Sequence, residues 1–322
     1  MRRRWLIWFV CGGLSHPLLA ADRLRKPVVA PLRQVLNMAK GELQWEYRGK
    51  PLLVYAFADN QFKPYVRELY TLRGENVLRD APADHLHHHG LMYAVQVNGI
   101  NFWEEGDEPG IEKSIRLVPG RMGRNAAGRP EAAFTQTIHW VAFPHRKTAD
   151  SAAVALLIEN RTLTLTVDAA AGEVALVWEA RFELGPNTPR VRLHGANYNG
   201  LGLRLPESLD QVARFVNSAG TAFAADHPPS VTPARWTGVS GTVAGQDIAL
   251  ALFARDENAN GRARFFTMTR PFAYLAATQG LDGKPLEYRN GERFGVRYLL
   301  TVYAENKSRA FMAQRAAQWS DE

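Results

Sequence analysis

The sequence predicts an all-β protein built as a large antiparallel β-sandwich with a short C-terminal helix. Two observations predict this fold. Hydrophobic and polar residues alternate along most apolar segments, which is the pattern of strands with one buried face. Turn signals such as Asn98-Gly99, Ala171-Gly172 and Asn290-Gly291 separate these segments at short intervals, as in sandwiches and barrels.

The predicted elements follow from these periodicities. The clearest alternating segments are residues 41–48, 162–167, 173–184, 248–253 and 293–303. Apolar residues recur at helical spacing over Ser308–Trp319, so this segment predicts a helix. The remaining assignments are a short turn at Pro31–Lys40 and loops at Gly120–Pro130, Asp226–Pro233 and Asp256–Arg262. No internal repeat or clear linker divides the chain, so we expect residues 22–322 to form a single β-sandwich domain.

The first 21 residues have the pattern of a signal peptide. Arginines precede an apolar run that begins at Trp5, and Ala20 and Ala21 offer a small-residue cleavage site. We therefore expect a periplasmic or secreted protein. Cys11, the only cysteine, lies in this segment, so the mature chain would contain no disulfide. No later segment is apolar enough to predict a stable membrane span.

Composition and charge exclude some classes of partner. The chain is 46% hydrophobic and 22% charged, as in ordinary globular proteins. Its net charge of +7 would fall to +4 once residues 1–21, with their three arginines, are removed. Basic residues are scattered among acidic ones, so no nucleic-acid partner is expected. The expected partner is a small molecule or saccharide, and the sequence points to no cofactor and no particular oligomeric state.

A histidine cluster is the strongest candidate site. Four of the nine histidines lie within the five positions from His85 to His89. In an extended chain His85, His87 and His89 would share one face, with His88 opposite. Such imidazoles can transfer protons, bind a metal or bind a sugar, and Asp84 could orient one of them. No metal site is assigned because no HExxH pattern or cysteine completes a ligand set. A surface cluster without function is the alternative.

An acidic turn follows at Trp103–Glu108. Its adjacent carboxylates, Glu104 and Glu105, could act as acid and base if they converge with the histidines. A solvated acidic turn is the simpler interpretation.

Two further segments offer polar groups. Residues 194–204 are rich in glycine and include His194, Tyr198 and Arg204, which could contact a ligand or simply form a sheet corner. Arg270 could bind a carboxylate or pair with a surface acid. No Gly-x-Ser-x-Gly motif is present, which disfavours acyl transfer.

Residues 79–103 resemble the signature of a known family. The segment reads RDAPADHLHHHGL…VNGINFW and is similar to the DHPHHRGLW…VNGVDFW signature of the secreted bacterial family labelled methane oxygenase PmoA, or PmoA-like. Weaker matches extend the resemblance to roughly residues 42–305. Two positions depart from it: Leu86 replaces proline, and His89 replaces arginine, so a permanent cation becomes a titratable group.

The resemblance implies a fold and a class of chemistry. It implies a galactose-mutarotase-like supersandwich and a carbohydrate-associated role, in which a histidine and a carboxylate pass protons on a sugar. The methane-oxidising label itself does not fit a chain without transmembrane helices. His87, His88 and Arg204 match family motif positions, which makes them the best candidates for proton transfer and substrate binding.

These observations lead to competing hypotheses. The first is an enzyme of epimerase, lyase or glycosidase type that acts on a saccharide. The second is a non-catalytic module that binds a carbohydrate or cell-envelope ligand, and a weaker third is a metal-dependent oxidoreductase. The candidate residues are His87, His88 and Glu104 for catalysis, and His85, His89, Tyr198, His194, Arg204 and Arg270 for substrate binding.

Overall fold

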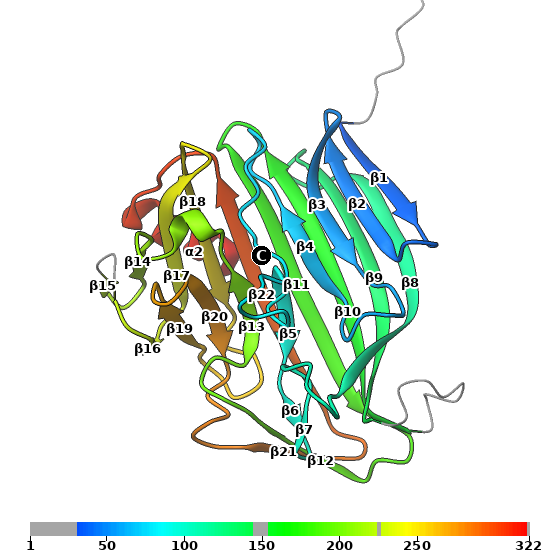
Figure 1. The fold of residues 1–322 in the computed structure, drawn as a ribbon. Helices are drawn as coiled ribbons and strands as arrows, with labels where there is room; N and C mark the ends of the chain where they lie inside the picture. The colour runs from blue at the N-terminus through cyan, green and yellow to red at the C-terminus, as the bar shows by residue number, and fades with distance from the viewer. Residues whose placement is uncertain (1–30, 144–153, 224–226, 321–322) are drawn as a thin grey trace, which may run out of the picture. The chain divides into compact units, whose positions relative to one another are not determined.

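The computed structural model describes residues 31–143, 154–223 and 227–320. The predicted signal peptide lies outside these residues. The described chain is dominated by antiparallel strands and has one helix near its C-terminal end (Figure 1). The sequence-based prediction of an all-β antiparallel sandwich with a short C-terminal helix is confirmed.

The first sheet has nine strands and carries the candidate site. Its order is β1-β2-β3-β4-β5-β13-β20-β19-β16. In that order the strands are β1 (Leu32–Asn37), β2 (Glu42–Tyr47), β3 (Lys50–Ala56), β4 (Tyr65–Leu69), β5 (Leu91–Ala94), β13 (Gly200–Arg204), β20 (Tyr274–Thr278), β19 (Arg264–Met268) and β16 (Ser230–Pro233). Neighbouring strands are antiparallel, so residues paired across them share a face of the sheet.

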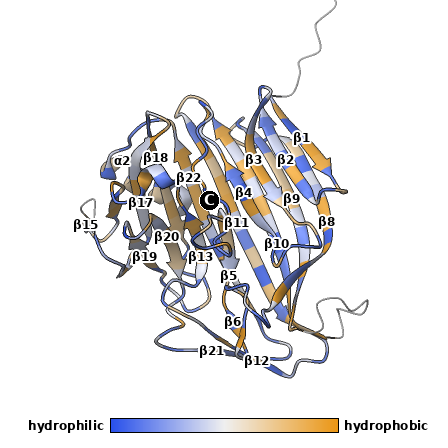
Figure 2. Cartoon of the chain, in the orientation of Figure 1, coloured by the Kyte–Doolittle hydropathy of each residue, from blue (hydrophilic) through white to orange (hydrophobic). Residues whose placement is uncertain are grey.

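The second sheet also has nine strands and includes the longest ones. Its order is β15-β14-β17-β18-β22-β11-β10-β9-β8. The strands are β15 (Ala222–Phe223), β14 (Arg214–Asn217), β17 (Trp236–Val243), β18 (Gln246–Ala254), β22 (Arg293–Tyr303), β11 (Glu173–Leu184), β10 (Ala155–Asp168), β9 (Pro130–Val141) and β8 (Ile111–Arg124). Hydrophilic and hydrophobic residues alternate along the long strands (Figure 2).

A small third sheet and two helical segments complete the fold. The sheet has the order β21-β12-β6-β7. Its strands are β21 (Leu286–Arg289), β12 (Arg190–His194), β6 (Gln96–Val97) and β7 (Ile100–Asn101), and the helical segments are η2 (Glu207–Leu209) and α2 (Arg309–Ser320).

The main core lies between the two large sheets. Tyr93 of β5 packs against Trp140 of β9 and Phe182 of β11, with ring centroids 6.2 and 5.7 Å apart. Trp45 of β2 packs on Phe134 of β9 at 5.5 Å. These contacts cross from one sheet to the other, so the alternation seen in the sequence buries one face of each sheet in a shared core.

Helix α2 covers part of the outer face of the second sheet. Met312 and Trp319 are buried in a separate cluster with Phe253 of β18 and Leu299 of β22. Ser308 caps the helix, since its Oγ accepts a hydrogen bond of 3.1 Å from the Phe311 amide. The helix thus protects an apolar strip on a face that is otherwise largely polar.

Three local predictions are wrong. The loop predicted at Asp226–Pro233 contains strand β16, because Ser230–Pro233 pairs with β19. Pro31–Lys40 contains a strand, β1, which pairs with β2 from Leu32 to Asn37. Much of Gly120–Pro130 is also strand, because β8 runs to Arg124 and only residues 125–129 turn back to β9. Both β1 and β8 are sheet edges, where exposed polar residues hide the alternation that identifies a strand.

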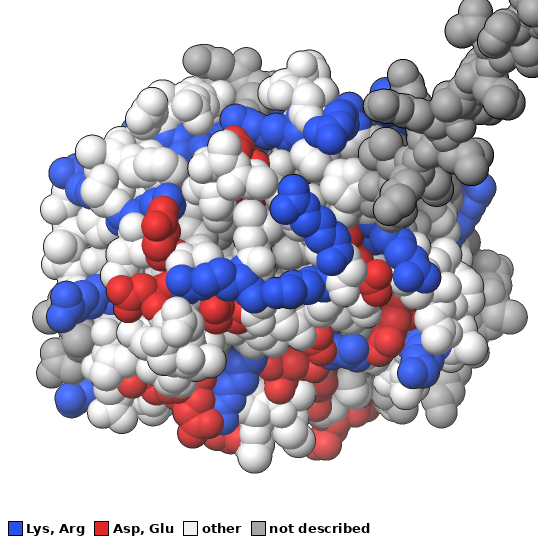
Figure 3. All heavy atoms as spheres, turned by 90° about the horizontal axis from the view of Figure 1, so that it is seen from above, with Lys and Arg blue, Asp and Glu red and all other residues white. Residues whose placement is uncertain are grey.

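The surface carries charges of both signs. In the view from above, acidic and basic side chains are interspersed over the visible face (Figure 3). Within the residues that the structure describes, no helix has the length and apolarity needed to cross a membrane.

Candidate functional site: a histidine–arginine cluster on the first sheet

The site lies on the face of the first sheet that points away from the second. Tyr93 points into the main core, and its partner across the β5–β13 ladder is Leu201. The next residue, Gly202, therefore lies on the opposite face, as does Arg204 two positions further on. Arg204 pairs with Tyr274 of β20, so strand alternation places both side chains on this outer face.

The loop that carries the histidines folds into tight turns over this face. His85 donates its backbone N–H to Pro82 O at 2.9 Å, and His88 donates to His85 O at 2.9 Å. The loop is tied to β13 because Arg79 N donates to Arg204 O at 2.9 Å. The expectation of one extended face with His85, His87 and His89 is therefore wrong: the turns bring His85 and His88 together.

Three imidazoles pack against one another in this loop. The rings of His85 and His88 stack with centroids 4.5 Å apart and an interplanar angle of 19°. His87 meets the His88 ring edge-on at 4.6 Å. The buried rings of Phe272 and Tyr274 lie 5.3 and 5.5 Å from His88, which gives the imidazoles an apolar floor.

Arg204 joins this group from β13. Its guanidinium lies over the Phe272 ring at 3.5 Å, and its Nη2 donates a hydrogen bond of 3.2 Å to Asp84 Oδ2. The same carboxylate oxygen lies 3.0 Å from His85 Nδ1. Asp84, His85, His87, His88 and Arg204 thus form one unit, which we call the histidine–arginine cluster.

Several buried polar atoms of the cluster lack a partner. Arg204 is fully buried, and its Nε and Nη1 make no hydrogen bond within the described part of the chain. The same holds for Nδ1 of His88 and for the Tyr274 hydroxyl. Buried polar groups are nearly always hydrogen-bonded in folded proteins, so these atoms need an explanation.

The electrostatic environment keeps the inner histidine neutral. Burial, together with the nearby charges of His87, His85 and Arg204, lowers the pKa of His88 to about 3, although Asp84 opposes this effect. Burial also lowers the pKa of His87, although Glu104 opposes this effect. Desolvation raises the pKa of Asp84, but the hydrogen bond with His85 and the charge of Arg204 hold it below its usual value.

The residues of the cluster differ in their exposure to solvent. His88 is 7% exposed, whereas Asp84 is exposed and His85 and His87 are half-buried. Gly202 allows the aromatic floor to sit close to β13, because a Cβ at this position would overlap the Tyr274 hydroxyl and lie 2.9 Å from Trp103 Cη2. The arrangement is a shallow polar rim over a closed floor.

His89 belongs to a separate ionic group. Its Nδ1 lies 2.9 Å from Asp80 Oδ1 and its Nε2 lies 2.9 Å from Glu105 Oε1. Buried Lys63 pairs with the same Glu105 oxygen at 2.7 Å. The ring stacks on Tyr65 at 4.0 Å, and the Tyr65 hydroxyl donates to Asp80 Oδ2 at 3.1 Å.

The two carboxylates favour a protonated His89. Desolvation lowers the pKa of His89, but the hydrogen bonds with Asp80 and Glu105 outweigh it and raise the pKa above its usual value. Desolvation also raises the pKa of Glu105, but His89 and Lys63 lower it to about 2. An imidazolium therefore bridges two carboxylates in this group, which we call the His89 ion group.

Two other candidate residues, Glu104 and Tyr198, lie beside the cluster. Glu104 is exposed and accepts a hydrogen bond of 3.3 Å from Asn101 Nδ2, yet its charge acts on His87 and Tyr198. The half-buried Tyr198 ring packs against Trp103 at 5.5 Å. These residues border the cluster without a hydrogen bond to it among the described contacts.

His194 and Arg270 lie outside the cluster's network of described contacts. His194 ends β12 in the third sheet, where its Nε2 accepts the Gly99 N–H at 3.1 Å. This contact holds the turn between β6 and β7. Arg270 is exposed and directly precedes Pro271.

Some residues of the site carried no specific signal in the sequence. Lys63 and Tyr65 lie before and at the start of β4, far in sequence from the histidines. Phe272 and Tyr274 lie close to Arg270 in sequence, but only Arg270 was predicted as a site residue. Among the described residues, no group of three or more His, Cys, Asp or Glu side chains is arranged to hold a metal ion.

Comparison with protein families gives one match. Residues 42–317 match the model described as "Family of unknown function (DUF6807)". The chain belongs to this family. The matched range includes the histidine–arginine cluster and the His89 ion group. The comparison does not return the PmoA-like label, which stays a prediction, and no curated protein matched the sequence.

Several solved structures are similar to this chain at low sequence identity. The GH36 α-galactosidase AgaB from Geobacillus stearothermophilus aligns with 85% of this chain and 41% of its own, at 10% identity and a TM-score of 0.50. The galactosidase domain of the α-galactosidase–sucrose kinase AgaSK gives 85% and 42%, at 10% identity and 0.49. A galactose mutarotase-related enzyme from Lactobacillus acidophilus gives 86% and 99%, at 7% identity and 0.38.

These matches describe architecture. This chain spans about two fifths of the length of the α-galactosidases that it matches. At 10% identity, the similarity to AgaB shows a shared β-sandwich fold.

Proposed function

We propose that this protein binds a saccharide at the histidine–arginine cluster and transfers protons on it, in a reaction of epimerase or lyase type. The observation that carries the proposal is Arg204, a fully buried guanidinium whose Nε and Nη1 lack partners in the described part of the chain. Leaving such a donor unpaired costs about 1–3 kcal/mol, and more for charged groups. Hydroxyl or carboxylate oxygens of a ligand would satisfy it.

The histidines supply the proton-transfer groups. His88, with a pKa of about 3, is neutral at neutral pH, and the pKa of His87 is also below its usual value. A neutral imidazole can accept a proton from a substrate. His87 is half-buried, and the charge of Glu104 raises its pKa against the effect of burial. We therefore assign His87 as the base and Glu104 as the carboxylate that stabilises its protonated form.

The carboxylates favour proton abstraction over glycoside cleavage. Most glycosidases use two carboxyl groups that flank the scissile bond. Here Asp84 is already engaged by Arg204 and His85, and Glu104 is exposed. Imidazole is then the better-placed acid/base group, as in reactions that remove a proton next to a carbonyl or carboxylate.

Similarity to carbohydrate-active proteins supports a saccharide as the ligand. AgaB, which shares the fold, is an α-galactosidase. The resemblance of residues 79–103 to the PmoA-like signature points the same way. Both are indirect, so the proposal rests on the chemistry of the cluster.

A non-catalytic carbohydrate-binding protein is the second candidate. The burial of both His88 and Arg204 favours it, because only the rim formed by Asp84, His85 and His87 meets solvent. In that case the rim would hold a ligand without turnover.

A saccharide panel incubated with the protein in D₂O, followed by ¹H NMR, tests the proposal. We expect exchange of a sugar C–H for deuterium or the appearance of a new sugar. His87→Ala should abolish this reaction and retain binding, whereas Arg204→Met should weaken binding itself. His194→Ala, outside the cluster, is the control. Unchanged turnover in His87→Ala would refute the assigned base, and binding without turnover by the unmodified protein would select the second candidate.

We also propose that the protein is exported to the periplasm or the medium. The support is the signal-peptide pattern of residues 1–21. N-terminal sequencing of the protein recovered from each compartment tests this, and recovery of an intact N-terminus from the cytoplasm alone would contradict it.

A further inference from the structure

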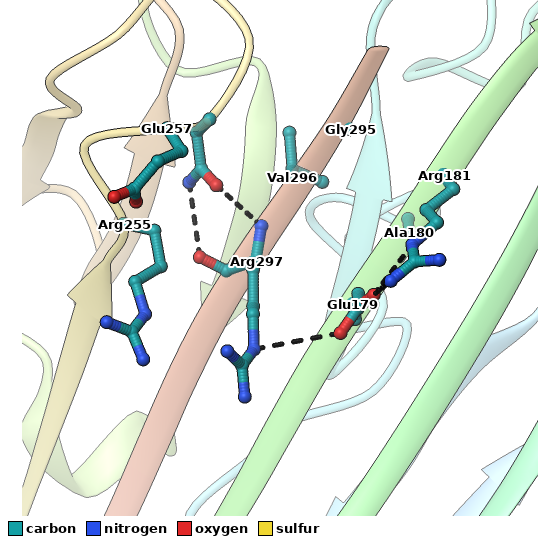
Figure 4. Close-up of a pocket in the computed structure, with 9 residues that line it drawn as sticks. Glu179, Ala180, Arg181, Arg255, Glu257, Gly295, Val296 and Arg297 are labelled. Carbon is teal, nitrogen blue, oxygen red and sulfur yellow. Dashed lines mark hydrogen bonds and ion pairs between the residues drawn. The ribbon is translucent and has the colours of Figure 1, made fainter. Parts of the chain in front are cut away.

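A hollow on the outer face of the second sheet has no role in the proposed chemistry. It has a volume of about 450 Å³ and lies between β11, β22 and the segment after β18 (Figure 4). Its lining residues are Glu179, Ala180, Arg181, Arg255, Glu257, Asn258, Gly295, Val296 and Arg297. A second hollow of about 490 Å³, bounded by α2, shares Arg255 and Glu257 with it.

Hydrogen bonds fix the shape of the first hollow. Asn258 Oδ1 accepts the Arg297 backbone N–H at 2.6 Å, and Asn258 Nδ2 donates to Arg297 O at 3.2 Å. The Ala259 N–H donates to Gly295 O at 2.9 Å. The segment after β18 is therefore bound to β22, and the hollow is preformed rather than a gap between loose loops.

Two guanidinium groups lie together in this hollow. Those of Arg255 and Arg297 stand over the same Trp319 indole, at 4.4 and 6.0 Å from its centroid, and Figure 4 shows both side chains extending in the same direction. Stacking on an indole orients a guanidinium and leaves its N–H edges free to bind. The two groups are thus held in place before any ligand arrives.

The arginines have unused hydrogen-bonding capacity. Nε of Arg255 is buried and makes no hydrogen bond within the described part of the chain. Nε of Arg297 is also buried and has only an ion pair of 3.7 Å with Glu179 Oε2. Arg255 donates to Ser320 O at 3.0 Å and has no carboxylate within ion-pair distance among the described residues. Glu179 lies 3.7 Å from Arg297 and also forms an ion pair of 2.7 Å with Arg181. Its single negative charge is therefore shared between Arg181 and Arg297 and fully neutralises neither of them.

We propose that this hollow binds a carboxylate-bearing ligand the size of a sugar acid. The lining holds three arginines against two glutamates, an excess that matches a monoanion. An arginine fork is suited to the planar, bidentate geometry of a carboxylate. The volume falls within the range of small-molecule sites. This site is on the other sheet from the histidine–arginine cluster, so it does not depend on the proposed function.

Calorimetric titration of the purified protein with glucuronate, glucose and inorganic phosphate tests the proposal. Glucuronate should bind at the hollow at least about tenfold more tightly than glucose, because a charge-assisted hydrogen bond contributes roughly that factor or more. Arg255→Met and Arg297→Met should each weaken glucuronate binding by about tenfold or more. Arg255→Lys, which keeps the charge but removes the fork, should also weaken it.

The controls separate this site from general charge effects and from the cluster. Arg192→Met removes an exposed arginine from β12, where the side chain is 61% exposed, and should leave binding unchanged. The histidine–arginine cluster contributes no residue to this hollow, so loss of binding in Arg255→Met or Arg297→Met assigns that binding to the hollow. Three results would overturn the proposal. Arg192→Met could weaken glucuronate binding as much as Arg255→Met does, Arg255→Met could bind glucuronate as tightly as the unmodified protein, or the unmodified protein could bind glucuronate no more tightly than glucose. Tighter binding of phosphate than of glucuronate overturns the carboxylate assignment.

Discussion

Replacing His89 should remove much of the stability that the His89 ion group contributes. The imidazolium makes two close contacts, each 2.9 Å, with Asp80 and Glu105, and stacks on Tyr65. Charge-assisted hydrogen bonds contribute about 1.5–3 kcal/mol each, and removing one partner of a buried ion pair typically costs about 3–5 kcal/mol. These side chains are at most 25% exposed, so solvent screening is modest. We expect His89→Ala to lower the free energy of unfolding by about 3–5 kcal/mol.

The same group predicts a pH dependence with a definite sign. The pKa of His89 is raised above its usual 6.5 in the folded protein. Its stabilisation is therefore complete below the unfolded pKa and is lost as pH rises through the folded pKa. His89→Arg places a permanent cation between the same carboxylates, so its stability should not fall in this way.

Urea unfolding followed by tryptophan fluorescence at pH 5.5, 7 and 8.5 measures both effects. Titrations of other groups are common to the native protein and His89→Arg, so they cancel in the difference between the two. His194→Ala serves as a histidine control and should lower the unfolding free energy by only about 0.5–1.5 kcal/mol, the contribution of one hydrogen bond. A native protein that gains stability relative to His89→Arg as pH rises would refute the reasoning.

Three further predictions concern packing and protonation. Gly202→Ala forces a Cβ into the Tyr274 hydroxyl and close to Trp103, so thermal unfolding should show a loss of about 1–3 kcal/mol; an unchanged melting temperature would contradict this packing. Trp319→Ala removes a buried anchor of α2 and should cost about 3–5 kcal/mol, measured by urea unfolding, with a Phe311→Ala change at a half-buried position of the same helix costing less. Because the pKa of His87 lies below its usual value of 6.5, activity of the enzyme should fall with acidity only below about that pH. A pH–rate profile that already declines above pH 7 toward acid would oppose the role of His87 as base.

The sequence was most informative where strands are half-buried. Glu173–Leu184 and Arg293–Tyr303 were predicted with the bounds that β11 and β22 have, because their alternation records which face meets the core. Edge strands β1 and β8 escaped prediction, since little of their surface is buried and polar residues occupy both faces. Burial, which creates the periodic signal, is weakest at the edge of a sheet.

A buried ionic group shows a different limit. Glu159 and Arg161 have the same parity in β10 as Leu157 and Leu163, and both are fully buried in the main core. Arg161 Nε donates to Glu159 Oε1 at 2.6 Å and Nη2 donates to Glu112 Oε2 at 3.1 Å. Charged residues at the apolar positions of an alternating strand indicate a buried ion pair. The third member of this group, Glu112, comes from β8, so the sequence of β10 alone cannot predict it.

The sequence predicted candidate residues for the site but not how their side chains are arranged. The motif predicted His85, His87 and His88 as candidate residues, and the family resemblance added Arg204. The structure brings these four residues into one cluster, and their roles stay predictions. The stacking of His85 on His88 depends on turn hydrogen bonds that composition does not specify. The pairing of His89 with Glu105 rather than Glu104 depends on how the chain folds back over the first sheet.

The most direct test of the central claim is an NMR titration of protein labelled with ¹⁵N at its histidines, using a saccharide identified in the panel. A ligand seated on the histidine–arginine cluster should shift the imidazole signals of His87 and His88 and leave that of His194 in place, and the shifts should disappear in Arg204→Met. Saturable binding that moves none of the cluster imidazoles would show that the ligand site lies elsewhere on the molecule.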